Sequence, residues 1–321
     1  NNEASINGYT DKMYNILLTC PPMIKQISRY EDLLDKYNFK ITIPDFQQVM
    51  TEEDLCKIIG QYDGWIIGDD PATKKVFQEG IKGNLKACVK WGVGTDNVDF
   101  DACKELDIPI CNTPQMFGEE VSDVAIGYLL CLSRQLHTIH TSVINNEWIK
   151  PCGETLTGKK VCVVGFGDIG KCIVRKLQAF TMDIWVSDPL YLDKKSEYND
   201  INIDLLDNCL ENANYVITCC PLNKHTFHLL NKEKILLCQK RVKIINVGRG
   251  SVVCEKDVID LLENGYIDSV GFDVFEEEPL SHDSKLRDFK QNIFGTHNGS
   301  NTLEAVDKVT IKVLNKLISF L

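Results

Sequence analysis

The chain has 321 residues, and its 46 acidic and 35 basic side chains give a formal net charge of −11. This length suits two domains, and 44% hydrophobic with 25% charged residues is typical of a globular enzyme. The acidity argues against a nucleic-acid partner, which requires a basic surface. The sequence also lacks an apolar run of about 20 residues, so we expect no membrane span.

The chain contains 14 cysteines, but no C-x-x-C pair. Several lie in apolar strand-like segments, where cysteine behaves as a small buried hydrophobic residue. We therefore expect reduced thiols, no metal site and a cytoplasmic location. The polar N-terminus lacks the basic and apolar regions of a signal peptide.

The first third of the chain alternates strand-like and helix-like segments. Strands are predicted at 15–20, 39–43, 63–68, 85–91 and 108–114, and helices at 22–36, 51–62, 73–81 and 101–106. This β–α alternation predicts a parallel sheet covered by helices, which we expect to be flavodoxin-like.

A second alternating series follows a predicted long helix at 114–134, which could link two domains or lie in a dimer interface. Six strands are predicted, at 161–165, 183–187, 215–219, 243–247, 269–273 and 292–295. Six matches the number in a doubly wound dinucleotide-binding sheet. A last helix, 301–320, is expected to return to the first domain. The α/β fold is thus a Rossmann-like domain at 116–298 inserted into a substrate domain formed by 1–115 and 299–321.

The sequence VCVVGFGDIG contains a G-x-G-x-x-G motif at the end of a predicted strand. Gly165 permits the tight turn, Gly167 lets the backbone approach a pyrophosphate, and Gly170 lets the helix pack on the strand. Asp168 and Ile169 begin that helix, whose first amides would face the phosphate charge. The alternative is a glycine-rich turn in another nucleotide fold, including one that binds S-adenosylmethionine.

Asp188 stands at the end of the next predicted strand, 183–187. Its carboxylate is placed to accept hydrogen bonds from the adenosine ribose hydroxyls. A carboxylate there repels a 2′-phosphate, so we expect the cofactor to be NAD rather than NADP.

Three chemically reactive side chains follow the last three strands of the second series. They are Arg249, Glu278 and His297. Because ligands of open α/β sheets bind outside the carboxyl ends of the strands, all three should face one crevice. Together they offer a cation for a carboxylate or carbonyl, a proton carrier, and a carboxylate that favours the protonated imidazole. That set, beside a nicotinamide, predicts reduction of a 2-oxo acid. A methyltransferase would leave these three residues without a role.

With these motifs in order, the chain resembles the D-isomer-specific 2-hydroxyacid dehydrogenases. The resemblance runs from Ile66 onward and rests on GVGTDNVD, CNTP, LTGKKVCVVGFGDIG, CPLNKHT, INVGRG, DVFEEEPL and HNGSNTLEA. It implies that Arg249, Glu278 and His297 are catalytic and that Asp273 holds the nicotinamide carboxamide. It further implies substrate contacts from Lys90, Trp91, Val93, Gly94 and Asn97, and cofactor contacts from Cys219, Pro221, Thr226 and Val247.

The chain departs from the family pattern at three positions. Thr296 replaces the usual Pro before the histidine, Asn298 replaces an apolar residue after it, and Cys219 replaces a His before Pro221. None of the three positions is one of the implied catalytic residues, so the expected activity is unaffected. The departures bear instead on substrate preference and on the packing of the cofactor.

The resemblance implies a 2-oxo or 2-hydroxy acid as substrate, and Lys74, Lys75 and Lys90 favour 3-phosphoglycerate unless they are solvated surface charges. Trp91 could instead narrow the pocket for glyoxylate or hydroxypyruvate. No regulatory domain is expected after the last helix, and we expect a homodimer. The alternative to an enzyme is an NAD(H)-sensing corepressor or scaffold of the same fold.

Overall fold

The computed structural model describes residues 12–321, which form two compact α/β units. Unit 1 combines residues up to Met116 with Thr302–Leu321, and unit 2 is Phe117–Asn301. The predicted domain boundaries at 115/116 and 298/299 lie close to these two breaks. The absence of a signal peptide was expected from the N-terminal residues, and most of those residues lie outside the described part of the chain.

Unit 1 is built on a five-stranded parallel sheet in the order β2-β1-β3-β4-β5, the flavodoxin-like order. Its strands are β1 (Tyr14–Leu18), β2 (Phe39–Thr42), β3 (Gly64–Ile67), β4 (Ala87–Lys90) and β5 (Ile110–Cys111). Its helices are α1 (Pro21–Ile24), α2 (Glu31–Lys36), α3 (Glu52–Ile58), α4 (Lys74–Lys82), α5 (Phe100–Glu105) and α12 (Leu303–Phe320), with 3₁₀ turns at Ile27–Tyr30 and Ile59–Gln61.

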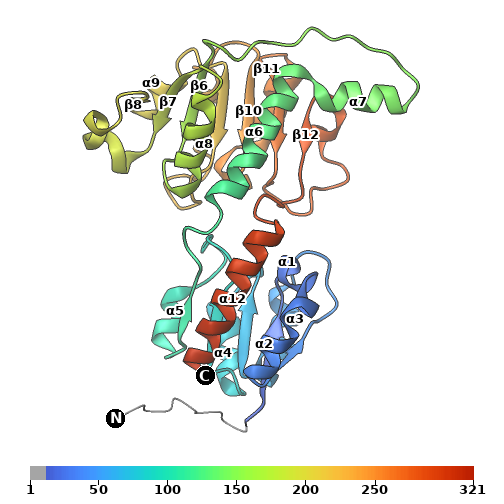
Figure 1. The fold of residues 1–321 in the computed structure, drawn as a ribbon, viewed down its shortest axis with the longest axis vertical. Helices are drawn as coiled ribbons and strands as arrows, with labels where there is room; N and C mark the ends of the chain where they lie inside the picture. The colour runs from blue at the N-terminus through green and yellow to red at the C-terminus, as the bar shows by residue number, and fades with distance from the viewer. Residues whose placement is uncertain (1–11) are drawn as a thin grey trace, which may run out of the picture. The chain divides into compact units, whose positions relative to one another are not determined.

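Helix α12 returns to unit 1 from the far end of the chain and packs on β4 (Figure 1). Thr302 caps its N-terminus, because the hydroxyl accepts a hydrogen bond from the amide of Ala305 at 3.1 Å. Val309, Val313 and Leu317 are fully buried along one face. The expected return of the last helix to the first domain is therefore what the structure shows.

Unit 2 is built on a seven-stranded parallel sheet in the order β12-β11-β10-β9-β6-β7-β8. Its strands are β6 (Lys160–Val164), β7 (Asp183–Ser187), β8 (Asn202–Ile203), β9 (Tyr215–Thr218), β10 (Val242–Asn246), β11 (Ile267–Phe272) and β12 (Ile293–Phe294). Read from β8, the first six follow the 3-2-1-4-5-6 order of dinucleotide-binding domains, which confirms the predicted fold class. The point where the order reverses lies between β6 and β9.

Two helical layers cover this sheet. Its helices are α6 (Gly118–Arg134), α7 (Leu136–Ile144), α8 (Asp168–Gln178), α9 (Leu206–Leu210), α10 (Lys232–Ile235) and α11 (Glu255–Glu263), with 3₁₀ turns at Pro189–Glu197, Gly250–Val252 and Lys285–Asp288. Helices α6 and α8 pack side by side on one face (Figure 1). On the other face, α9, α10 and α11 enclose a core that includes Cys162, Val216 and Ile244.

Three details of the prediction were wrong. The segment 22–36 is not one helix, since α1, a 3₁₀ turn and α2 divide it. The two-residue strand β8 was missed because it is too short for a periodic signal. Helix α6 begins at Gly118 rather than near Pro114, and a separate helix, α7, follows it after Gln135 adopts a left-handed conformation with φ of 53°.

No helix within residues 12–321 is long and apolar enough to cross a membrane.

Candidate active site

The predicted catalytic residues follow three neighbouring strands of unit 2. Strands β10, β11 and β12 lie side by side and parallel, so their carboxyl ends share one edge of the sheet. Arg249 follows β10, Glu278 follows β11 and His297 follows β12. The fold therefore brings together three loops that are separated along the chain.

His297 and Glu278 form a direct pair. The imidazole Nδ1 lies 2.8 Å from Glu278 Oε2, and both side chains are 22% exposed. The other carboxylate oxygen accepts a hydrogen bond from the amide of Phe275 at 3.0 Å, so both oxygens of Glu278 are held. This arrangement directs Nδ1 towards the carboxylate and Nε2 away from it.

The backbone of His297 is in the left-handed region, with φ of 53°. This conformation is uncommon for residues other than glycine and persists when the surrounding structure supports it. Here the amide of His297 donates to the carbonyl of Asp273 at 2.7 Å, which ties the residue to the end of β11. The local strain thus fixes the direction in which the imidazole leaves the backbone.

The loop that carries Arg249 is held by Asn246, the last residue of β10. The Asn246 side chain accepts from the amide of Gly248 at 3.1 Å and donates to the carbonyl of Arg249 at 2.9 Å. Gly250 follows, and a Cβ at that position would overlap the backbone of Phe275. The sequence analysis did not predict this bracing role of Asn246. The available signal was a polar residue at the end of a mostly apolar strand.

Asp273 is 3% exposed and accepts three hydrogen bonds. The donors are the amide of Gly299 at 2.9 Å, the amide of Asn298 at 3.3 Å and the hydroxyl of Tyr128 at 3.2 Å. Burial, together with the Asp273 charge, raises the pKa of Tyr128, so its hydroxyl remains a donor. Tyr128 lies in the predicted long helix 114–134, and its contact with Asp273 is a finding of the structure.

The glycine turn between β6 and α8 has the geometry that a dinucleotide phosphate needs. Gly165 has φ of +105°, which favours glycine, and a Cβ at Gly170 would overlap the carbonyl of Gly165. A Cβ at Gly167 would meet no atom within 4 Å, so the space beside it is open. Asp168 and Ile169 form the first turn of α8, whose amides lie at the turn.

Asp188 lies at the end of β7 next to this turn. Its Oδ2 accepts from the amide of Phe166 at 2.8 Å and its Oδ1 from the amide of Leu190 at 3.0 Å. A carboxylate has about four lone-pair sites, so acceptor capacity remains for ribose hydroxyls. The residues present therefore fit NAD.

The remaining predicted cofactor residues lie after β9 and β10. The thiol of Cys219 lies 3.4 Å from the carbonyls of Val164 and Gly165, directly beneath the glycine turn, and burial raises its pKa. Thr226 donates to the carbonyl of Pro221 at 2.7 Å and thereby closes the loop between them. Val247 is 6% exposed at the end of β10.

The predicted substrate residues belong to unit 1. Val93 is 37% exposed, and its carbonyl accepts from Asn112 at 3.0 Å, while Gly94 is half-buried. The Asn97 side chain donates to the carbonyls of Gly68 and Asp70 at 3.1 and 2.7 Å. Asn97 therefore braces the loop that follows β3.

Lys90 and Trp91 are buried rather than accessible. Lys90 is 2% exposed, donates to the carbonyl of Gly68 and pairs with Asp69 at 3.0 Å. The Trp91 indole donates to the Thr310 hydroxyl on α12 at 3.2 Å. The structure does not support an exposed ammonium at position 90.

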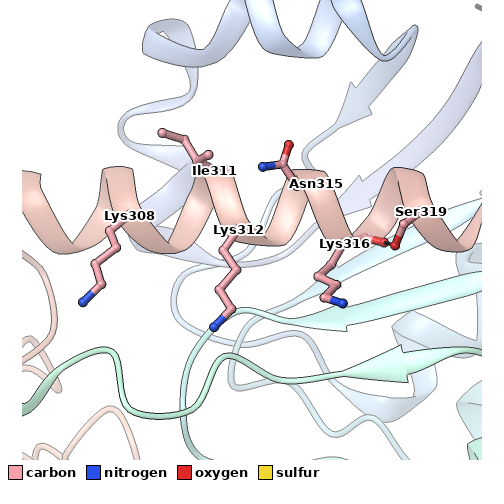
Figure 2. A pocket seen from close by; sticks show the side chains of 6 residues that line it. All are labelled: Lys308, Ile311, Lys312, Asn315, Lys316 and Ser319. Atoms are coloured by element: carbon pink, nitrogen blue, oxygen red, sulfur yellow. Dashed lines mark hydrogen bonds between the residues drawn. The ribbon is translucent and has the colours of Figure 1, made fainter. Parts of the chain in front are cut away.

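A hollow of about 380 Å³ lies along α12 (Figure 2). Figure 2 shows Lys308, Lys312 and Lys316 on one side of this helix. None of the predicted site residues lines the hollow, so we do not assign the active site to it.

Comparison with known proteins identifies the family. The family model for the NAD binding domain of D-isomer specific 2-hydroxyacid dehydrogenases matches residues 126–299, more than half of the chain. The chain belongs to this family. It is therefore an NAD-dependent oxidoreductase that acts on the CH–OH group of a 2-hydroxy acid.

Individual relatives of this dehydrogenase differ in how much of their length they share with it. A hydroxypyruvate reductase of Thermotoga maritima is 29% identical over 292 residues, which is 89% of this chain and 92% of that protein. A D-3-phosphoglycerate dehydrogenase of Bacillus subtilis is 32% identical over 239 residues, or 74% of this chain and 45% of that protein. The apo structure of D-lactate dehydrogenase from Escherichia coli has a TM-score of 0.79 at 25% identity, and the match covers 94% of this chain and 95% of that chain.

Proposed function

We propose that Arg249, Glu278 and His297 carry out the chemistry of this dehydrogenase. The observation that carries the proposal is the hydrogen bond of 2.8 Å between His297 Nδ1 and Glu278 Oε2. In the reductive direction, His297 gives a proton from Nε2 to the carbonyl oxygen of the 2-oxo acid. In the oxidative direction, the same nitrogen takes the proton from the hydroxyl. NADH, when bound, supplies the hydride that reduces C2.

The two other residues act electrostatically. Glu278 stabilises the protonated imidazole because opposite charges in close contact favour the charged form. Arg249 binds the substrate carboxylate and polarises the carbonyl, a preorganised contribution that does not require reorganisation during the reaction. Asp273 orients the nicotinamide carboxamide, and we propose Val93, Gly94 and Asn97 as the substrate-binding loop.

We test the function by following NADH absorbance with hydroxypyruvate, glyoxylate, pyruvate and 3-phosphohydroxypyruvate. Turnover of at least one 2-oxo acid is the expected result. Binding of NADH without turnover of any of them would instead favour the sensing corepressor or scaffold.

We further propose that the substrate is a small unphosphorylated 2-oxo acid of the hydroxypyruvate or glyoxylate type. The phosphorylated alternative depended on three lysines, and each of them forms an ion pair within unit 1. Lys74 pairs with Glu105, Lys75 with Glu52 at 3.4 Å, and Lys90 with Asp69. The pairs of Lys74 and Lys75 are exposed, whereas Lys90 is buried against Asp69, so its ammonium is not accessible to a substrate phosphate, which supports the unphosphorylated substrate.

The ratio of kcat/KM for hydroxypyruvate to that for 3-phosphohydroxypyruvate tests this choice. A ratio above about tenfold, equivalent to about 1.4 kcal/mol of transition-state stabilisation, is expected. A preference for the phosphorylated acid would overturn the substrate proposal while leaving the dehydrogenase assignment intact.

We propose that the enzyme is a homodimer formed through α7 and the segment that follows it. Five large apolar side chains are exposed there: Leu136 (49%), Val143 (49%), Ile144 (65%), Trp148 (79%) and Ile149 (43%). Figure 1 shows α7 projecting from the body of unit 2. An apolar arm of this kind is costly in water, and a second copy of the same arm would cover it.

Light scattering during size-exclusion chromatography tests the assembly. Wild-type protein is expected at twice 36.3 kDa, and Trp148→Asp combined with Ile144→Asp is expected to give the monomer. Leu205→Asp is the matched control, because Leu205 is 59% exposed but lies elsewhere on unit 2. A monomeric wild-type protein would overturn the dimer.

We propose that the protein is located in the cytoplasm. This location is supported by the 14 cysteines, which are all free thiols, seven of them buried. Detection of the protein in membrane-free cell fractions is the measurement that checks it.

A further inference from the structure

A cluster of metal-ligating side chains lies outside the catalytic set. His228, Cys254 and Glu276 each offer one donor atom, and these three atoms lie within 4.8 Å of one another. His228 Nε2 lies 3.1 Å from Glu276 Oε1. The three residues come from the loop after β9, the N-terminus of α11 and the segment after β11.

The backbone builds this cluster firmly. The segment at Leu230 pairs with Val253 as a parallel bridge, and the amide of Cys254 donates to the carbonyl of Leu230 at 3.1 Å. Glu276 is tied to the first residue of α11 by two reciprocal bonds. The Glu255 amide donates to Glu276 Oε1 at 2.8 Å, and the Glu276 amide donates to Glu255 Oε1 at 2.6 Å. The donor atoms are therefore preorganised.

The imidazole of His228 is held in place but lacks a hydrogen bond at Nε2. Its ring stacks on Phe227 with centroids 4.0 Å apart and an interplanar angle of 20°. Nε2 is buried and has no hydrogen-bond partner among residues 12–321, and Glu276 Oε1 lies within ion-pair distance of it. Buried polar atoms without a partner are rare in folded proteins, so Nε2 has room in its hydrogen-bonding capacity for a bound ion.

The surroundings of the cluster are strongly acidic. Glu255, Asp257, Glu276, Glu277 and Glu278 lie on the same two segments. A divalent cation would lower the electrostatic cost of bringing these groups together.

We propose that His228, Cys254 and Glu276 form a binding site for a divalent transition metal of the zinc type. Mixed nitrogen, sulfur and oxygen donors suit Zn²⁺, and three protein ligands leave a fourth position for water. Binding replaces the thiol proton of Cys254, which leaves to solvent, so the metal is held by a thiolate, an imidazole and a carboxylate.

Such a metal would fasten the segment that carries Glu278. Glu276 is two residues before Glu278, and the amide of Phe275 holds Glu278 Oε1 at 3.0 Å. The site is distinct from the three catalytic side chains, and its ligands act on them only through the position of this segment.

The test uses the full chain without an affinity tag, freed of metal and titrated with Co²⁺. The wild type is expected to bind about one Co²⁺ per chain and to develop a near-ultraviolet thiolate-to-cobalt band. Cys254→Ser and His228→Ala are expected to lose the band and at least tenfold in affinity. Added Zn²⁺ should raise the Tm of the wild type but not of these two variants, since a ligand that binds the folded state stabilises it.

Two matched controls keep the proposal falsifiable. Cys152→Ser removes an exposed thiol, and His225→Ala removes an exposed imidazole from the loop that carries His228. Both are expected to bind Co²⁺ as the wild type does. Absence of the band in the wild type, its persistence in Cys254→Ser, or its loss in Cys152→Ser would each overturn the site. Circular dichroism of each variant shows whether it is folded.

Discussion

His297 Nδ1 and Glu278 Oε2 lie 2.8 Å apart, although the two residues follow different strands of the sheet. The left-handed backbone of His297 and the Phe275 amide bound to Glu278 hold the pair from both ends. In the proposed mechanism, proton transfer would then need little reorganisation, because both groups are held before substrate arrives.

Replacing His297 by Asn removes the proton carrier while retaining a polar side chain of similar size. We expect kcat/KM for 2-oxo acid reduction to fall by ~10²–10⁴-fold, the usual contribution of a general acid. NADH affinity, measured by fluorescence titration, should change little. A variant with wild-type turnover would rule out the assignment of His297.

Replacing Glu278 by Gln keeps an acceptor for the Phe275 amide but removes the negative charge beside the imidazole. Loss of that charge disfavours the protonated ring, so reductase activity should be lost at a lower pH than in the wild type. Oxidation, which needs the neutral ring, should extend to lower pH. The pH profiles of kcat/KM in both directions check this, and two unshifted profiles would contradict it.

Asp188 is expected to decide between NADH and NADPH. Asp188→Ala removes the charge that repels a 2′-phosphate, so the ratio of kcat/KM for NADH to NADPH should fall by at least tenfold. Asp188→Asn serves as the control for the turn. The Phe166 amide now donates to Asp188 Oδ2 over 2.8 Å, and the side-chain oxygen of Asn can still accept this hydrogen bond. The Asn variant should retain more thermal stability than the Ala variant, while both lose discrimination.

Tyr128→Phe removes one of the three donors to Asp273. A hydrogen bond to a charged group contributes about 1.5–3 kcal/mol, so we expect a rise of roughly tenfold or more in the KM for NADH or a matching fall in kcat. Tyr215→Phe is the matched control. The Tyr215 hydroxyl donates to Glu154 over 3.0 Å, and neither residue belongs to the predicted site. Tyr215→Phe should lower stability without changing the kinetics; equal kinetic effects would mean that Tyr128 acts only through stability.

The sequence by itself determined the order of elements and the type of site. Short β-branched runs and glycine motifs are local signals, and they predicted both sheets and the positions of Arg249, Glu278 and His297 after strands. The grouping of these three residues was predictable because parallel strands deliver their following loops to one edge of the sheet.

Only the tertiary structure decided which side chains hold one another. The contact of Tyr128 with Asp273, the engagement of Lys90 with Asp69, and the cluster of His228, Cys254 and Glu276 each join segments far apart in the chain. Local periodicity carries no information about such distant partners. Their distances depend on how strands, helices and loops pack in three dimensions, and that packing decides which charges are buried, paired or available to a ligand.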